Sequence, residues 1–344
     1  MKAAYSEPGS GKVELREVEI PKVDEGELLV KMRAVGICGT DLEKVYGKPI
    51  TPPMLGHEVV GDIVDSRAEG YKVGERVFAH HHVFCGKCYY CYHGNYTMCP
   101  LFLKTTIIPC GFADYFKVPR TNVDRGAVLK IPDHVSDDEA VFIEPAGCAL
   151  KGIKRSGFKP GMSVSITGVG PMGAIFIKLL RAFGASFIAA ADLIDFRIEF
   201  AKKLGADVAV NPKEDDFAKI CVEQTEGRGV DIAILATPSV KALQTALNTL
   251  RKGGALLIFG APEKGERAEL DFSYIFLNEI NVITSYSTSE LETNLALRLI
   301  ANGVVSFSDL ITHKFSLDEI GKAFEVAHDP TKSMKVVITA RREG

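Results

Sequence analysis

The sequence predicts an α/β protein with a β-rich N-terminal domain followed by a doubly wound parallel sheet. Short apolar or alternating runs separated by glycine and proline dominate the first 150 residues, which is typical of a small β-domain. From about residue 159 onward, apolar strands alternate with helical stretches, the rhythm of a parallel sheet with crossover helices. A glycine-rich turn stands at the first strand-to-helix transition of this second part.

The composition excludes several classes of partner. With 344 residues, the chain is long enough for two domains of ~100–200 residues each. The formal net charge of −3 provides no global basic field for nucleic acid or for an anionic membrane. The N-terminus lacks the apolar stretch of a signal peptide, and no apolar run reaches the ~18 residues of a membrane span. We therefore expect a cytoplasmic protein that acts on a small molecule.

The individual elements follow from these patterns. In the N-terminal part, we expect strands at 27–35, 59–64 and 72–78. In the second part, the expected strands are 163–167, 186–192, 230–236, 255–259 and 280–284, with a last strand at 335–339. Helical spacing is found at 172–183, 196–204 and 290–302.

Four cysteines lie close together in a glycine-rich loop: Cys85, Cys88, Cys91 and Cys99. Four thiolates complete the tetrahedron that Zn²⁺ prefers, which leaves no position for water and makes such a site structural. The alternative is four unrelated thiols, which the tight spacing disfavours. A disulfide scaffold is typical of short secreted chains, so we expect the other cysteines, Cys110, Cys148 and Cys221, to be buried apolar fillers.

A second group of residues offers mixed sulfur, nitrogen and oxygen donors, namely Cys38, His57, Glu58 and Glu144. Taken singly, each is unremarkable, because a lone cysteine is more often core and a His-Glu pair is usually surface. Together they are a plausible first shell for an open metal site. Asp41 is placed to hold the imidazole through its second nitrogen. Thr40 is placed to hydrogen-bond an alcohol bound at the metal.

The glycine-rich turn is Gly168-Val-Gly170-Pro-Met172-Gly173. The first glycine allows a tight turn, the second lets the backbone approach a pyrophosphate, and the third lets the helix pack on the strand. The helix N-terminus supplies free N–H groups for the phosphates. The alternative is a plain glycine turn, but the strand–turn–helix context favours a dinucleotide site.

Asp192 ends the next strand, about twenty residues after the glycines. A carboxylate at that place can accept hydrogen bonds from both ribose hydroxyls and repels a 2′-phosphate, so we expect NAD rather than NADP. Arg197 is a weaker candidate for an adenine or ribose contact, and its alternative is a solvated helix residue.

The run His80-His81-His82 has the appearance of a metal site. Adjacent residues on a strand point to opposite faces, however, which disfavours the alternative of a shared metal ion. We interpret these histidines as structural or pocket-lining residues.

The same motifs identify a family. In order along the chain they are Gly36-Ile-Cys-Gly-Thr-Asp, Gly56-His-Glu, Val73-Gly-Glu-Arg-Val, the four cysteines, Gly111-Phe-Ala-Asp-Tyr, Ile143-Glu-Pro and Gly168-Val-Gly-Pro-Met-Gly. With them, essentially the whole chain resembles the zinc-dependent medium-chain dehydrogenases. The similarity is greatest to the polyol branch, which contains sorbitol dehydrogenases and L-threonine 3-dehydrogenases.

The resemblance implies an architecture and a set of cofactors. Residues 1–150 would form a GroES-like catalytic domain with a structural zinc lobe, residues 151–289 a Rossmann NAD-binding domain, and residues 290–344 a segment that returns to the catalytic domain. Two zinc ions per chain, NAD and a homo-oligomer, either tetramer or dimer, are implied with it.

The resemblance also assigns roles to residues. Cys38, His57 and Glu58 would be the catalytic zinc ligands, and Glu144 would lie near or on the metal, in some relatives acting through water. Thr40 matches the relay hydroxyl of the family. At the position of the outer relay histidine of many members, this chain has Glu43.

The expected activity is reversible NAD-linked oxidation of a secondary alcohol, such as a polyol, sugar or amino alcohol, to the ketone by hydride transfer. One alternative is a sensor of NAD and NADH with a vestigial metal site, which the complete ligand set disfavours. Another is a zinc-ribbon nucleic-acid module. It would need a basic face, yet Lys87 is the only lysine or arginine between Cys85 and Cys99.

Overall fold

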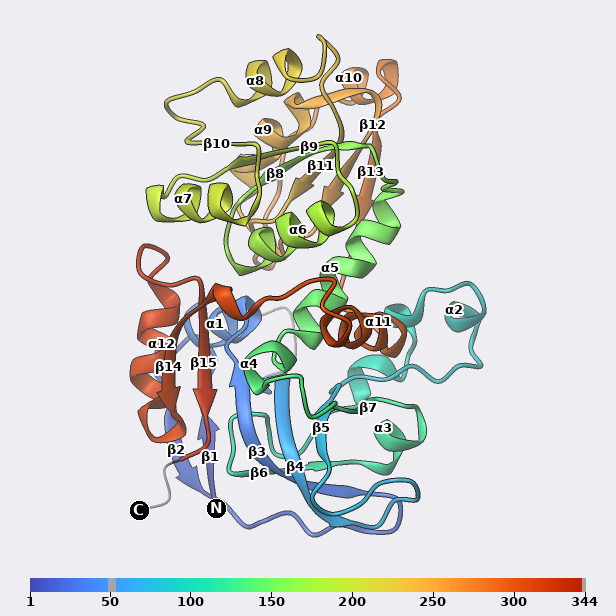
Figure 1. Cartoon of the computed structure of the whole chain (residues 1–344), viewed down its shortest axis with the longest axis vertical. Helices are drawn as coiled ribbons and strands as arrows, with labels where there is room; N and C mark the ends of the chain where they lie inside the picture. The colour runs from blue at the N-terminus through green and yellow to red at the C-terminus, as the bar shows by residue number, and fades with distance from the viewer. Residues whose placement is uncertain (49–53, 342–344) are drawn as a thin grey trace. The chain divides into compact units, whose positions relative to one another are not determined.

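The computed structural model describes residues 1–48 and 54–341, and within them the chain divides into two compact units. The first unit runs from Met1 to Gly147, takes up the chain again at Ser287–Asp329 and ends with the segment from Lys335 onward. The second unit consists of Cys148–Tyr286 and Pro330–Met334. Figure 1 shows the β-rich character of the first unit and the helix-flanked sheet of the second.

The first unit is built on a mainly antiparallel sheet (Figure 1). In its described residues, the strand order is β14-β15-β3-β4-β5-β7, and β6 also pairs with β3. The strands are β14 Ile311–Ser316, β15 Lys335–Thr339, β3 Leu28–Gly36, β4 Glu58–Ser66, β5 Arg76–Ala79, β7 Val128–Lys130 and β6 Tyr115–Val118. A separate hairpin joins β1 Lys2–Tyr5 and β2 Glu14–Glu17.

The first unit also contains helices. They are α1 Gly39–Tyr46, α2 Tyr89–Tyr92, α3 Arg120–Asp124, α4 Asp137–Ala140, α11 Glu290–Ala301 and α12 Ile320–His328. Helix α5, Ile143–Ser156, begins in the first unit and ends in the second. Single 3-10 turns occur at Tyr96–Met98, Phe102–Lys104, Ser308–Leu310 and Leu317–Glu319. Phenylalanines 112, 116 and 324 pack with the aliphatic residues of β3 and β4 in one core.

The register of β3 decides what comes together at its end. Gly36, the last residue of β3, lies opposite Glu58 of β4 on one side and opposite Val337 of β15 on the other. Strand β3, from the early part of the chain, therefore lies between β4, which carries Glu58, and β15, which carries Val337. This register brings the end of the chain to the His57-Glu58 pair.

The second unit holds the predicted parallel sheet. Its strand order is β10-β9-β8-β11-β12-β13, and all the pairings between described residues are parallel. The strands are β8 Ser163–Thr167, β9 Phe187–Ala191, β10 Val208–Val210, β11 Val230–Leu235, β12 Leu250–Ile258 and β13 Asn281–Thr284. The order reverses between β8 and β11, the topological switch point at which such sheets bind ligands.

The helices of this unit are α6 Pro171–Ala182, α7 Asp195–Leu204, α8 Phe217–Glu223, α9 Leu243–Asn248 and α10 Phe272–Leu277, with a 3-10 turn at Val240–Ala242. Helices α6 and α7 agree with the predicted helices to within one residue at each end, whereas the sequence patterns do not predict β10 or α8–α10. These elements have three to seven residues, too few to show a clear period. Among the described residues, no helix is both long and apolar enough to cross a membrane.

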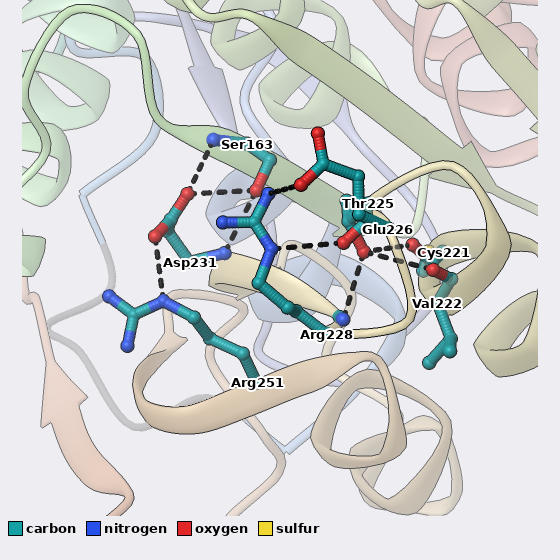
Figure 2. A network of polar contacts seen from close by, with 9 residues as sticks. Ser163, Cys221, Val222, Thr225, Glu226, Arg228, Asp231 and Arg251 are labelled. Atoms are coloured by element: carbon teal, nitrogen blue, oxygen red, sulfur yellow. Dashed lines mark hydrogen bonds and ion pairs between the residues drawn. The ribbon is translucent and has the colours of Figure 1, made fainter.

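A polar network fixes the beginnings of the three central strands (Figure 2). The Asp231 carboxylate of β11 accepts hydrogen bonds from the backbone N–H and the hydroxyl of Ser163, both at 2.8 Å, and pairs with Arg251 Nε at 2.7 Å. Next to it, Thr225 Oγ1 donates to the carbonyl of Cys221 and accepts from the N–H of Gly229. Strands β8, β11 and β12 are thus tied at one end, and the glycine-rich turn follows the opposite end of β8.

Candidate functional site

The structure brings Cys38, His57 and Glu58 together. One donor atom from each of the three lies within 4.8 Å of the other two. Cys38 follows β3 and is the N-cap residue of α1, His57 immediately precedes β4, and Glu58 begins it. His57 and Glu58 are buried, whereas Cys38 is partly exposed, so the group opens to solvent on the cysteine side.

Asp41 holds both sides of this group. Its Oδ2 accepts the backbone N–H of Cys38 at 3.0 Å and its Oδ1 accepts that of Gly56 at 2.9 Å. Oδ1 also lies 3.6 Å from Nδ1 of His57, which is ion-pair distance rather than hydrogen-bond distance. The carboxylate therefore fixes the backbone on either side and faces the imidazole as a negative charge.

The electrostatics of the group favour a cation. Burial by itself would lower the pKa of His57, but the charges of Asp41, Cys38 and Glu144 outweigh it and raise that pKa to about 10. A pKa this high means that the surrounding anions attract a positive charge strongly. A soft thiolate, an imidazole and a carboxylate so arranged are a donor set that suits zinc.

One residue in direct contact with the group is not predicted by any sequence motif. Lys335, the first residue of β15, is 2% exposed; its Nζ forms an ion pair with Glu58 Oε2 and donates to the carbonyl of Ile37 at 3.0 Å. A Cβ on Gly36 would clash with both members of the pair, at 1.9 Å from Glu58 Oε2 and 2.8 Å from Lys335 Cε. Glycine at position 36 is thus required by the close packing of this ion pair.

The other two predicted residues of the site border this group. Glu144 is buried in the first turn of α5, and its negative charge contributes to the raised pKa of His57. It is not among the three residues whose donor atoms converge within 4.8 Å. Thr40, in the first turn of α1, is partly exposed and lies two residues after Cys38.

The four clustered cysteines form a second group with metal-site geometry. Their sulfur atoms lie within 4.8 Å of one another, with Cys88 3.5 Å and Cys85 4.0 Å from Cys91. Bonds of ~2.3 Å from sulfur to a tetrahedral zinc imply sulfur–sulfur separations of about 3.8 Å, so the loop already fits the ion. The pKa of Cys85 is lowered to about 6, chiefly because its sulfur accepts a hydrogen bond from the backbone N–H of Lys87. No disulfide is present among the eight cysteines, and Cys110, Cys148 and Cys221 are buried as predicted.

The glycine-rich turn has the geometry that the motif requires. Gly168 has a φ of +95°, a conformation that other residues rarely adopt. A Cβ on Gly173 would lie 2.2 Å from the carbonyl oxygen of Gly168, so only glycine lets α6 pack this closely. Gly170 caps α6, with proline in the first helical position and Met172 partly exposed after it.

Asp192 and Arg197 both lie against this turn. The Asp192 carboxylate accepts the N–H of Val169 at 2.7 Å and that of Ile194 at 3.1 Å. Arg197 Nη1 is 3.8 Å from Asp192 Oδ2, and the guanidinium is 3.8 Å from the position of a Cβ on Gly170. Burial lowers the pKa of Arg197, and the charge of Asp192 opposes that change. Arg197 therefore faces the dinucleotide motif and is not a freely solvated helix residue.

The strand alternation expected for the three consecutive histidines needs correction, whereas their interpretation as structural or pocket-lining residues stays a prediction. They follow β5 instead of lying in it, so the alternation of a strand does not apply. His80 and His81 are both buried, and the ring of His81 lies 4.9 Å from that of the candidate ligand His57. No motif predicts this contact, because it depends on how the segment after β5 turns inward.

Comparison with known proteins identifies relatives of both units. The family model "Alcohol dehydrogenase GroES-like domain" matches residues 24–133, and "Zinc-binding dehydrogenase" matches residues 171–302. A sorbitol dehydrogenase of Bacillus subtilis is 33% identical, covering 99% of this chain and 98% of that protein. An L-threonine 3-dehydrogenase of Pyrococcus horikoshii is 35% identical, with 93% of each chain covered.

Solved structures agree as well. The 2R,3R-butanediol dehydrogenase of Bacillus subtilis is 29% identical with a TM-score of 0.86, covering 99% of each chain. The alcohol dehydrogenase TADH of Thermus sp. ATN1 is 26% identical with a TM-score of 0.88, covering 99% of this chain and all of that one.

The two family models describe a GroES-like domain and a zinc-binding dehydrogenase domain, and together with the parallel sheet and the structural neighbours they confirm the predicted fold class. The chain belongs to the zinc-dependent medium-chain alcohol dehydrogenase family, close to its polyol and threonine dehydrogenases. It is an enzyme that oxidises or reduces alcohol and carbonyl groups with zinc and a nicotinamide cofactor. The alternative of a sensor without activity is not favoured.

Proposed function

We propose that the chain catalyses the reversible NAD-linked oxidation of a secondary alcohol of the polyol, sugar or amino-alcohol class, with two zinc ions per chain. The observation that carries this proposal is the convergence of Cys38, His57 and Glu58 in a buried, anionic group that is open on one side. The relatives include sorbitol, threonine, butanediol and idonate dehydrogenases, and these activities support the substrate class.

In this proposal Cys38, His57 and Glu58 hold the catalytic zinc, and Cys85, Cys88, Cys91 and Cys99 hold a structural one. A zinc ion supplies Lewis-acid stabilisation of negative charge on the substrate oxygen. Asp41 keeps the imidazole in place, and Lys335 compensates the charge of Glu58. Thr40 is partly exposed beside Cys38. Its hydroxyl would accept the proton of the substrate hydroxyl and donate its own proton toward solvent. Gly168, Gly170 and Gly173, with Met172, position the dinucleotide.

The two metal groups should respond differently to loss of one ligand. Cys38→Ser should remove about one of two zinc ions per chain and reduce activity by more than roughly 100-fold, while the fold is retained. Cys91→Ser should chiefly lower thermal stability, because the closed tetrahedron holds the loop. Emission spectrometry of zinc, thermal melting and NADH production with a panel of polyols measure these effects. An unchanged zinc content in Cys38→Ser would show that the open group is not a metal site.

The two candidate carboxylates should also differ. An open zinc site has three protein ligands and one position for water or substrate. Since Glu58 converges with Cys38 and His57 and Glu144 stands outside that group, Glu58 is the firmer ligand. Glu58→Gln should weaken zinc binding more than Glu144→Gln, which should keep most of its zinc but lose kcat. Titration of both variants against the same chelator decides the order, and weaker binding in Glu144→Gln would reverse it.

NAD is the proposed cofactor, because Asp192 stands where ribose hydroxyls are expected and would repel a 2′-phosphate. Asp192→Ser should shift the ratio of kcat/KM values toward NADP by about 10-fold or more, since it also leaves Arg197 without its carboxylate partner. The same change removes an acceptor from the N–H of Val169, so KM should rise for both cofactors. A wild-type enzyme that prefers NADP contradicts the assignment.

We propose a homo-oligomer assembled through the edge of the Rossmann sheet. In the described part of the second unit, β13 is the last strand in the sheet order, and the neighbouring α10 exposes Phe272, Phe276 and Leu277 by 76%, 79% and 75%. Exposed strand edges and large apolar side chains favour association with a second copy. Phe272→Glu with Phe276→Glu should lower the mass measured by light scattering, whereas Gln244→Glu on the exposed surface of α9 should not. A monomeric wild type excludes the oligomer.

A further inference from the structure

The four-cysteine loop is more open than a purely structural metal site requires. Cys91 and Cys99 are buried, but Cys85 and Cys88 are partly exposed. Beside the cluster, a hollow of about 230 Å³ opens to solvent, and it is lined by Cys85, Cys88, Cys99, Pro100, Leu101 and Lys104. Since residues beyond the cysteines help to line it, the hollow extends past the space between the sulfurs. A small solute can therefore reach the sulfurs on this side.

This access matters because a cysteine that binds a metal does so as the thiolate, which is also the nucleophilic form. Buried structural cysteines are inert, whereas accessible thiolates are the ones that oxidants attack. Cys85 and Cys88 are the two members of the cluster that meet this condition, because both are partly exposed and both line the hollow.

Of the two, Cys88 is better placed to react further. It is the N-cap residue of α2, and Cys91 lies within that helix, so the two are three positions apart on one turn. Their sulfurs are 3.5 Å apart, compared with 4.0 Å between those of Cys85 and Cys91. Only Tyr89 and Tyr90 lie between them, and both are exposed, so the turn can adjust with little loss of packing.

We propose that this loop is an oxidant-sensitive switch, in which a peroxide that enters the hollow converts Cys88 and Cys91 to a disulfide and the zinc ion is released. The Cys88 thiolate attacks one peroxide oxygen, the O–O bond breaks and hydroxide leaves, which gives a sulfenic acid. The Cys91 thiolate then attacks that sulfur and expels a second hydroxide. The peroxide gains the two electrons that the two sulfurs lose. Two thiolates remain, too few to complete the tetrahedron of a structural zinc.

This inference rests on the structural zinc of the proposed function, and it adds a modification site to that loop. It does not depend on the alcohol chemistry at the other metal group. Because the metal would stabilise the loop, the oxidised protein should melt at a lower temperature than the zinc-loaded one. A thiol reductant with added zinc should restore the original melting temperature, since a disulfide is a reversible product of oxidation.

The first test uses the zinc-loaded Cys38→Ser protein, because this change removes the partly exposed cysteine of the other metal group. Hydrogen peroxide, added with a chromogenic zinc chelator, should release the remaining zinc ion and consume two thiols per chain. The wild type is treated in parallel. Zinc release, thiol content and thermal melting are all measured, so the result does not depend on enzyme activity.

Peptide mapping identifies the disulfide in both proteins. Trypsin cleaves after Lys87 and Lys104, so Cys85 falls in peptide 77–87 and the other three cysteines fall in peptide 88–104. Mass spectrometry without reduction should find peptide 88–104 lighter by two hydrogen atoms. Its fragments should place the new bond between the first two cysteines of that peptide.

A matched pair of variants tests the role of the hollow. Leu101→Trp fills the hollow with a larger side chain and should slow zinc release by about 10-fold. Leu103→Trp is the control, because Leu103 is 49% exposed in the same loop and is not among the residues that line the hollow. Its rate should stay within about twofold of the parent. Leu101→Phe is the milder substitute if Leu101→Trp does not fold.

The possible outcomes are distinct. Zinc that stays bound in Cys38→Ser, under peroxide that oxidises Cys38 in the wild type, would overturn the switch and leave the proposed function intact. A crosslink between peptides 77–87 and 88–104, or equal release rates in the two tryptophan variants, would overturn it in the same way. A protein that holds no zinc at the four cysteines before oxidation would overturn the two-zinc assignment of the proposed function and this inference with it.

Discussion

The buried ion pair between Lys335 and Glu58 is the contact on which the first unit depends. Both residues are almost fully enclosed, and removing one member of such a pair costs about 3–5 kcal/mol because the other charge stays buried. The pair forms only if β15, from the end of the chain, lies beside β3, and only if position 36 lacks a side chain. The candidate metal group is therefore tied to completion of the sheet, and the C-terminal segment has a structural reason to return to the first unit.

The two candidate metal groups are built in opposite ways. The four cysteines lie within one loop of fifteen residues, so their spacing alone fixes which atoms can meet. Cys38 and the His57-Glu58 pair stand at the ends of two paired strands, β3 and β4, and their geometry is set by strand register and by Asp41, which accepts hydrogen bonds from the backbone on both sides. This difference suits the proposed roles of the two groups. A structural metal site only has to stabilise its own loop, whereas a catalytic metal site needs a rigid frame that leaves one coordination position for the substrate.

Local patterns explain what the sequence could predict. The glycine turn, the parallel strands and the cysteine loop each depend on residues near one another in the chain, and the longer helices show a clear period. Lys335 could not be found in this way, because it begins an apolar strand-like run and its partner is 277 positions earlier. The contact of His81 with His57 is equally non-local, and the rule of alternating strand faces was wrong there because β5 ends at Ala79.

The Rossmann unit shows how structural and recognition roles can share one side chain. Asp231 and its partners tie the starts of β8, β11 and β12, so the opposite end of the sheet, where the glycine turn lies, is the end left for a ligand. There Asp192 accepts two backbone N–H groups, and one of them belongs to the turn itself. In the proposed cofactor site the same carboxylate also meets the ribose, so a substitution made to change cofactor choice would disturb the turn as well. Arg197 lies against both Asp192 and Gly170, so under the proposed function the balance between these two charges would set how the turn receives a negatively charged cofactor.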